Sequence, residues 1–174
     1  VLQSRGLGDV YKRQPLENVV ECAKKIKSTR PDMILTVGGG TPIDTVKVSQ
    51  LCLTLGIFSS AELKKISGKI QNVNSNIRQI AVPTTLSGGE YSIVGGAMDT
   101  KRKLKESYLG TDLCPQVVIL DPYISTHTPN WLWLSTAIRS IDHAIEGFCS
   151  NLKNPLINHN ALETLRTVSY THLR

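Results

Sequence analysis

The spacing of apolar residues changes along the first part of the chain, and each change marks an expected element. From residue 15 to residue 29, apolar positions recur at helical spacing with lysines on the other side, which predicts an amphipathic helix. A short apolar run over residues 33–37 then stops at three glycines, which is typical of a buried parallel strand before a sharp turn. This order of helix and strand predicts an α/β domain.

A second helix is expected over residues 42–55, directly after the glycines. Thr41 suits the N-cap, Pro42 suits the first helical position, and Asp44 at the third position can reach back toward the cap. The helix is apolar on most faces, which predicts that it is buried, and Gly56 ends it.

The glycine turn itself, Gly38, Gly39 and Gly40, has two interpretations. Glycines adopt positive φ and allow close approach of a ligand, while the free N–H groups of the first helical turn point into the same space. That arrangement is an anion cradle suited to a pyrophosphate. Alternatively, the glycines serve only a tight strand-to-helix turn, because the run matches neither the G-x-G-x-x-G nor the G-x-x-x-x-G-K-[ST] pattern.

A second polar turn follows a second expected strand at residues 80–82. Thr84, Thr85 and Ser87 offer three hydroxyls there, so the turn is either another ligand-facing loop or an ordinary polar turn. A short helix and a surface loop are expected over residues 59–78. Further on, the pattern predicts a β-hairpin from residues 91–98 and 104–108 and a buried strand at 117–120.

The last part of the chain has helical spacing only. Pro129 begins a long expected helix, and another begins near Pro155 and runs past Leu165. The apolar seam of the first helix consists of Leu134, Ile138, Ile141, Ile145 and Phe148. We therefore expect an α/β domain over residues 15–124 that lacks its N-terminal part, and the start of a helical domain over 125–166. The ends, 1–14 and 167–174, are interpreted as non-native tails.

Composition excludes several classes of function. The 174 residues carry a net charge of +6, but no basic cluster with interleaved aromatics, so we expect no nucleic-acid partner. The basic run 101–105 is interpreted as a solvated turn. The four cysteines form no C-x-x-C pair, which speaks against a disulfide or zinc framework. No apolar run approaches the length of about 18 residues that crosses a membrane, so we expect a cytoplasmic protein without a membrane partner.

Four ordered motifs resemble the iron-containing alcohol dehydrogenase superfamily over roughly residues 15–166. They are Gly38-Gly39-Gly40-Thr41-Pro42-Ile43-Asp44, Pro83-Thr84-Thr85, Leu120-Asp121-Pro122 and Asp142-His143-Ala144-Ile145-Glu146-Gly147. The short spacing from Pro83 to Glu90 is most similar to the maleylacetate reductase-like branch. The resemblance implies a Rossmann-like parallel-sheet domain that binds NAD or NADP, a helical domain after it, and a homodimer.

The resemblance also implies which residues hold the cofactor. The pyrophosphate would lie on the glycine turn and the residues after it: Gly38, Gly39, Gly40, Thr41 and Asp44. The residues that would line the cofactor are Thr84, Thr85 and Leu120. Lys105 is a further candidate for the cofactor site.

The metal site is where the chain departs from the family pattern. Iron-dependent members have an Asp four residues before the His of their His-Ala-x-Glu motif, and this chain has Arg139 there. A cation is no metal ligand. His143 therefore has three interpretations: an iron ligand, a proton donor beside an Arg139 that holds a substrate carboxylate, or part of a polar helix face where Arg139 pairs with Asp142 and His143 with Glu146.

These observations favour an NAD(P)-dependent oxidoreductase that transfers hydride between the nicotinamide and a carbonyl or alcohol. Because Arg139 can bind an anion, the expected substrate is a small molecule that bears a carboxylate, and a metal is not expected to take part. Two alternatives remain: a lyase similar to dehydroquinate synthase, or a catalytically inactive fragment. We expect this stretch of chain alone to be inactive and to expose apolar surface on its sheet edge and on the seam helix.

Overall fold

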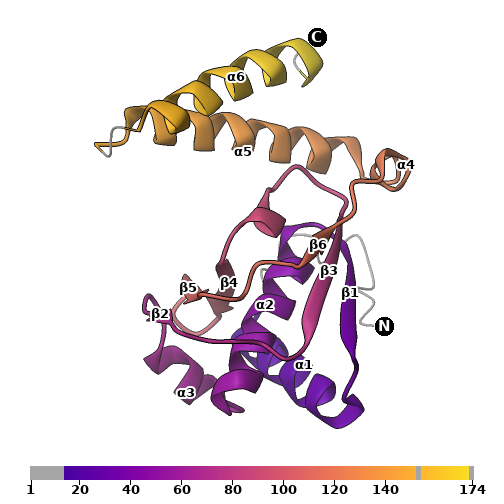
Figure 1. The fold of residues 1–174 in the computed structure, drawn as a ribbon, viewed down its shortest axis with the longest axis vertical. Coiled ribbons are helices and arrows are strands. Elements are labelled where there is room, and N and C mark those ends of the chain that lie inside the picture. Colours follow the sequence, from indigo (N-terminus) through magenta and orange to yellow (C-terminus); the bar gives the residue numbers. More distant parts are fainter. Residues whose placement is uncertain (1–13, 152–153, 173–174) are drawn as a thin grey trace. The chain divides into compact units, whose positions relative to one another are not determined.

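The computed structural model describes residues 14–151 and 154–172, and the chain in it forms two units. The first unit comprises residues 1–83 and 89–120, and the second comprises residues 84–88 and 121–174. Figure 1 labels the elements in chain order.

The predicted first helix is confirmed as α1 (Leu16–Thr29). Its apolar positions all fall on one side, and that side is buried: Leu16, Val19, Val20, Ala23 and Ile26. The helix ends at Arg30, which adopts the left-handed conformation with φ 48° and donates its N–H to the carbonyl of Ile26.

A parallel sheet follows, with the strand order β1-β3-β6. Its strands are β1 (Met33–Gly38), β3 (Arg78–Pro83) and β6 (Val117–Val118), and both pairings are parallel. Helix α2 (Gly40–Leu55) comes directly after β1 and packs on β1 and β3. The α/β class expected from the sequence is confirmed, and Figure 1 shows α2 beside these strands.

The expectation that these strands are buried is wrong for β1 and for the segment 117–120. Met33, Leu35 and Val37 are 54–61% exposed, and Leu120 is 66% exposed. The reason is the two-residue alternation of a strand: Thr36 lies on the side of α2, where its hydroxyl accepts a bond from Gln79 Nε2, whereas its apolar neighbours point to the opposite side. The regular strand near 117–120 is also shorter than expected.

The second sheet has the order β2-β5-β4. The predicted hairpin is confirmed as β4 (Val94–Asp99) and β5 (Leu104–Gly110), which pair antiparallel. The short strand β2 (Ile70–Gln71), which pairs parallel with β5, was not predicted. A three-residue 3-10 turn, η2 (Gly89–Tyr91), precedes β4.

The expected short helix is α3 (Ser60–Lys65). Ser59 caps it: its hydroxyl accepts from the N–H of Glu62 at 3.3 Å and also bonds to the Glu62 carboxylate at 2.8 Å. This reciprocal arrangement is a capping box, which holds the helix start in place.

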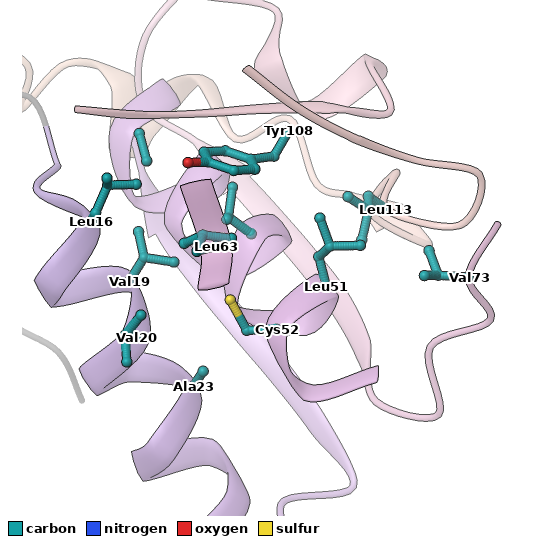
Figure 2. Packing of buried hydrophobic residues seen from close by; sticks show 12 residues of the cluster. Leu16, Val19, Val20, Ala23, Leu51, Cys52, Leu63, Val73, Tyr108 and Leu113 are labelled. Carbon is teal, nitrogen blue, oxygen red and sulfur yellow. The ribbon is translucent and has the colours of Figure 1, made fainter. Parts of the chain in front are cut away.

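The hydrophobic core of the first unit lies among α1, α2, α3 and the second sheet. Tyr108 from β5 is fully buried in it, and its hydroxyl donates to Glu106 at 2.6 Å (Figure 2). The cluster members labelled in Figure 2 are Leu16, Val19, Val20, Ala23, Leu51, Cys52, Leu63, Val73, Tyr108 and Leu113. Helix α2 has no polar face, and it has neighbours on most sides, so it is buried as the sequence predicted.

From residue 121 onward, the described residues of the second unit form helices and the turns between them. It contains α4 (Pro122–Ser125), α5 (Asn130–Cys149) and α6 (Pro155–His172). Helices α5 and α6 pack on each other, and Ala137 and Ala144 are the buried residues of α5. The apolar seam is exposed, as the sequence predicted for this stretch of chain: Leu134, Ile138, Ile145 and Phe148 are 48–58% exposed. None of the described helices has the length and apolarity needed to cross a membrane.

Candidate functional site

The glycine turn lies where the two strands β1 and β3 end side by side. Gly38 is the last residue of β1 and is in register with Pro83, the last residue of β3. Gly38 has φ +154°, and a Cβ there would lie 2.6 Å from Pro42 Cγ. Both the backbone and the close approach of Pro42 therefore require glycine at this position.

The other two glycines do not need a glycine backbone. Gly39 has φ −79° and ψ −166°, which other residues also adopt, and Gly40 is the first helical residue. The expectation that all three glycines use positive φ is wrong. What Gly39 and Gly40 provide is the absence of side chains beside the start of the helix.

The predicted capping arrangement is also wrong. The N-cap is Gly39, so Thr41 and Pro42 lie inside the first turn, and no side chain caps the helix. Glycine tolerates the N-cap position, which allowed the helix to start two residues early. The N–H groups at this helix start are therefore not bonded by a capping side chain, which suits them to an anion.

Asp44 bonds to a distant strand instead of the cap. Its Oδ2 accepts from the N–H of Gly96 in β4 at 3.0 Å. Burial raises the pKa of Asp44, while Lys47, the Gly96 N–H and Lys105 act in the opposite direction. The carboxylate is thus engaged within the protein.

Lys105 is brought to the same place. A Cβ on Gly96 would lie 2.2 Å from Lys105 Cε, so the lysine stem lies over this glycine. Lys105 is exposed, and its charge acts on Asp44. Of the predicted cofactor residues, the structure therefore brings Asp44 and Lys105 together across Gly96.

The basic run 101–105 is the turn of the β4–β5 hairpin and the start of β5, and all five of its side chains are exposed. This agrees with the interpretation of a solvated turn.

The second turn belongs to the helical unit. The carbonyl of Thr84 accepts from Thr128 Oγ1 at 2.7 Å, and the N–H of Leu86 donates to Thr136 Oγ1 at 3.2 Å. Thr85 is 8% exposed, and its hydroxyl lies 3.4 Å from that of Ser87. Thr84 is partly exposed, so it offers more surface to a ligand than Thr85 does.

Leu120 lies just after β6 and is 66% exposed. The next residue, Asp121, caps α4 by accepting from the N–H of Tyr123 at 2.8 Å.

On α5, Arg139 and Asp142 form an ion pair between Nη1 and Oδ2. This agrees with the interpretation of a polar helix face for Arg139. His143 is exposed on the same helix, four residues after Arg139. The pair occupies Nη1 of a guanidinium that carries five N–H donors.

The described residues do not fit a metal ion. Within residues 14–151 and 154–172, no group of three or more His, Cys, Asp or Glu side chains is placed to hold one. The position one turn before His143 holds the cation Arg139, already paired with Asp142.

The sequence reasoning missed Lys47, whose side chain is fully buried in the first unit. Lys47 Nζ donates to the carbonyls of Gly89, Ser92 and Val94, the last two at 2.8 and 3.1 Å. The available signal was a charged residue inside a helix that was expected to be buried, because a buried ammonium needs partners.

A glycine turn from a parallel strand into a buried helix is a feature of Rossmann-like α/β proteins, and the chain has this turn. The family profile described as iron-containing alcohol dehydrogenase matches residues 6–122. The chain belongs to the iron-containing alcohol dehydrogenase family.

Known relatives are dehydrogenases and reductases. The dehydrogenase ALT3 of Alternaria alternata is 34% identical over 147 residues, which cover 82% of this chain and 38% of that protein. The dehydrogenase FUM7 of Gibberella moniliformis is 31% identical over 159 residues, which cover 85% of this chain and 38% of that protein. The chain thus spans well under half the length of these relatives.

Solved structures share the fold. The sulfoacetaldehyde reductase from Bifidobacterium kashiwanohense, solved in complex with NAD+, superposes with a TM-score of 0.78 at 26% identity, covering 92% of this chain and 42% of that one. The maleylacetate reductase from Agrobacterium tumefaciens has a TM-score of 0.68 at 21% identity over 91% of this chain and 38% of its own, which shows the fold alone.

Proposed function

We propose that the complete protein containing this chain is an NAD(P)-dependent oxidoreductase that transfers hydride between the nicotinamide and a carbonyl or alcohol. The observation that carries the proposal is the glycine turn. It places the uncapped start of α2 at the end of β1, next to the end of β3. Family membership and a relative solved with NAD+ support the same cofactor.

The turn fits a dinucleotide pyrophosphate. Gly39 and Gly40 carry no side chain, their backbone conformations do not require glycine, and the helix start has no capping side chain. An anion is therefore admitted close to the backbone, where the N–H groups of Gly39, Gly40 and Thr41 donate to it. Gly38 sets the turn, and Thr84, Thr85 and Leu120 line the cofactor in this proposal.

Asp44 has a supporting role in this proposal. An ionised carboxylate is only an acceptor and repels a phosphate, and Asp44 is already bonded to Gly96. It holds β4 against α2. Lys105, exposed above Gly96, supplies positive charge to the proposed cofactor site.

The substrate is proposed to be a small molecule with a carboxylate. Arg139 is 56% exposed at its side chain, and its guanidinium has donors beyond the one bonded to Asp142. It can share its charge between Asp142 and a substrate carboxylate. His143 lies one helical turn further on and is proposed to donate the proton that a reduced carbonyl oxygen requires.

The bound nicotinamide supplies the hydride, and the protein orients it. Activity without a metal, a substrate like that of the maleylacetate reductases, and a homodimer are parts of the same proposal.

A pair of variants at Gly39 tests the proposal in the complete protein. Gly39→Asn and Gly39→Asp both place a favoured N-cap residue in an allowed conformation, so both are expected to fold. They have nearly the same shape, but the aspartate is charged and the asparagine is a neutral amide. The aspartate repels a pyrophosphate, so its dissociation constant for NADH or NADPH is expected to exceed that of the asparagine variant by about tenfold or more.

Nucleotide affinity is measured by fluorescence titration after circular dichroism has confirmed the fold. The asparagine variant is the matched control for the added side-chain volume. Equal affinities for the two variants would remove the glycine turn from the cofactor site.

A further inference from the structure

Lys47 is a fully buried lysine on the central helix α2, and its ammonium is directed at one stretch of backbone. Nζ donates to the carbonyl of Gly89, to the carbonyl of Ser92 at 2.8 Å and to that of Val94 at 3.1 Å. Ser92 Oγ lies 3.4 Å away as a further acceptor. Three backbone acceptors from one six-residue segment therefore converge on a single side chain.

This segment, residues 89–94, begins where the polar loop 84–88 ends. The loop starts after Pro83, which is held in the sheet beside Gly38. It ends at Gly89, whose carbonyl is bonded to Lys47. The two residues that flank this loop, Pro83 and Gly89, are therefore both held within the first unit, Pro83 by β3 and Gly89 by Lys47.

Two acidic side chains lie near Lys47. Asp44 Oδ1, one helical turn earlier on α2, lies 3.8 Å from Nζ. Glu90 in η2 is 4% exposed, and its Oε2 has no hydrogen-bond partner among the described residues. Burial lowers the pKa of Lys47, while Asp44, Cys114 and Glu90 favour its charged form.

The neighbouring contacts depend on the same placement. A Cβ on Gly95 would lie 2.7 Å from Val48 Cγ2 and 3.4 Å from Lys47 Cβ, so β4 lies very close to this part of α2. Asp44 binds the next residue, Gly96, at 3.0 Å. Residues of one helix face therefore hold the segment 89–96 along its length.

We propose that Lys47 is a positioning residue of the cofactor site, which fixes the segment 89–94 of the first unit to the helix that begins at the glycine turn. It touches neither cofactor nor substrate. A buried ammonium is costly to desolvate, and an apolar residue would suffice for packing alone. Its donors serve to hold the backbone of residues 89–94 against α2, the helix whose start is proposed to bind the pyrophosphate. This inference rests on the proposed function.

The test compares Lys47→Met with Lys64→Met in the complete protein. Lys64 is the matched control because it also binds a buried partner, Asp99, at 2.6 Å, but lies on α3. A titration with NADH yields two quantities, the dissociation constant and the number of binding sites. If the lysine only supports folding, its replacement reduces the number of binding sites. If it is a positioning residue, its replacement raises the dissociation constant of the molecules that are folded.

We expect Lys47→Met to raise the dissociation constant for NADH by about tenfold, because small misplacements of binding groups carry large penalties. The number of sites per folded molecule stays unchanged. Hydrogen exchange at the amides of residues 89–96 is expected to accelerate in this variant. Lys64→Met, which is expected to lower the overall stability through Asp99, is expected to leave the dissociation constant as in the wild type.

The other outcomes decide against the proposal. An unchanged dissociation constant in Lys47→Met, with or without faster exchange, assigns the lysine to folding alone. If Lys47→Met does not fold, Lys47→Gln, which keeps a donor, is judged by the same criteria. If neither folds, the positioning role is overturned. A wild-type protein that binds neither NADH nor NADPH overturns the proposed function, and the exchange comparison then decides whether Lys47 fixes the segment.

Discussion

The three consecutive positions 38, 39 and 40 are occupied by glycine for different physical reasons. Gly38 is required by its φ of +154° and by Pro42, whose Cγ would lie 2.6 Å from an added Cβ. Gly39 and Gly40 have conformations open to other residues. At the scale of single residues, the first glycine therefore shapes the turn, and the other two keep side chains away from the helix start.

Replacing Gly38 by alanine is expected to destabilise the fold. The strained φ and the contact with Pro42 together amount to about 1–3 kcal/mol of the free energy of unfolding. Urea denaturation followed by circular dichroism measures the loss. Gly39→Ser is the control, since serine is favoured at an N-cap and is expected to leave the stability nearly unchanged. A Gly38→Ala variant as stable as the wild type would show that the turn tolerates a Cβ.

Residue-scale predictions failed where the partner was distant in the chain. The sequence placed Asp44 at the helix start because capping rules describe local neighbours, yet its carboxylate binds Gly96, 52 residues further on. Lys47 was missed for the same reason, since its acceptors are 42 to 47 residues away. Only the tertiary fold determines such partners.

Elements with a strong local signal were predicted correctly, and those that depend on tertiary pairing were not. Helix α1 and the β4–β5 hairpin follow from periodicity and turn residues. The two-residue strand β2 exists because it pairs with β5, and its sequence alone carries no strand pattern. Helix α2 begins two residues earlier than predicted, because glycine and threonine are both acceptable at the N-cap.

The ion pair between Lys64 of α3 and Asp99 of β4 is expected to make the stability of the fold depend on pH. The hydrogen bond from Lys64 lowers the pKa of Asp99, with smaller contributions from the Arg102 and Lys101 N–H groups. A lowered folded-state pKa means that the ionised carboxylate stabilises the fold above the unfolded value of 3.8. This contribution disappears as the pH falls through the folded-state value.

Lys64→Met should therefore lower the urea midpoint at pH 7 and reduce the further loss of stability between pH 5 and pH 3, relative to the wild type. Urea titrations at several pH values measure both effects. Lys65→Met, at the exposed next position of the same helix, is the control. An acid response of Lys64→Met that parallels the wild type would mean that Lys64 does not set the ionisation of Asp99.

At the scale of the whole molecule, the sequence predicted the α/β class, the later helices and the exposed apolar seam of α5. It did not predict which side of β1 is exposed. That side depends on the helix that packs on the sheet, and α2 covers the side of Thr36 and Gln79. The opposite side of β1 presents Met33, Leu35 and Val37 to solvent in the described part of the chain.

The exposed side of β1 is expected to tolerate a charged side chain. Leu35 is 61% exposed, so Leu35→Lys is expected to change the free energy of unfolding by no more than about 0.5 kcal/mol. It should also lower the fluorescence of a bound apolar dye, because it interrupts a continuous apolar patch. Ala81→Lys, in the fully buried position on the neighbouring strand, is the contrast and should unfold the domain. Equal destabilisation by both lysines would show that the side of Leu35 is covered in solution, and the apolar residues of β1 would then belong to a packed interior.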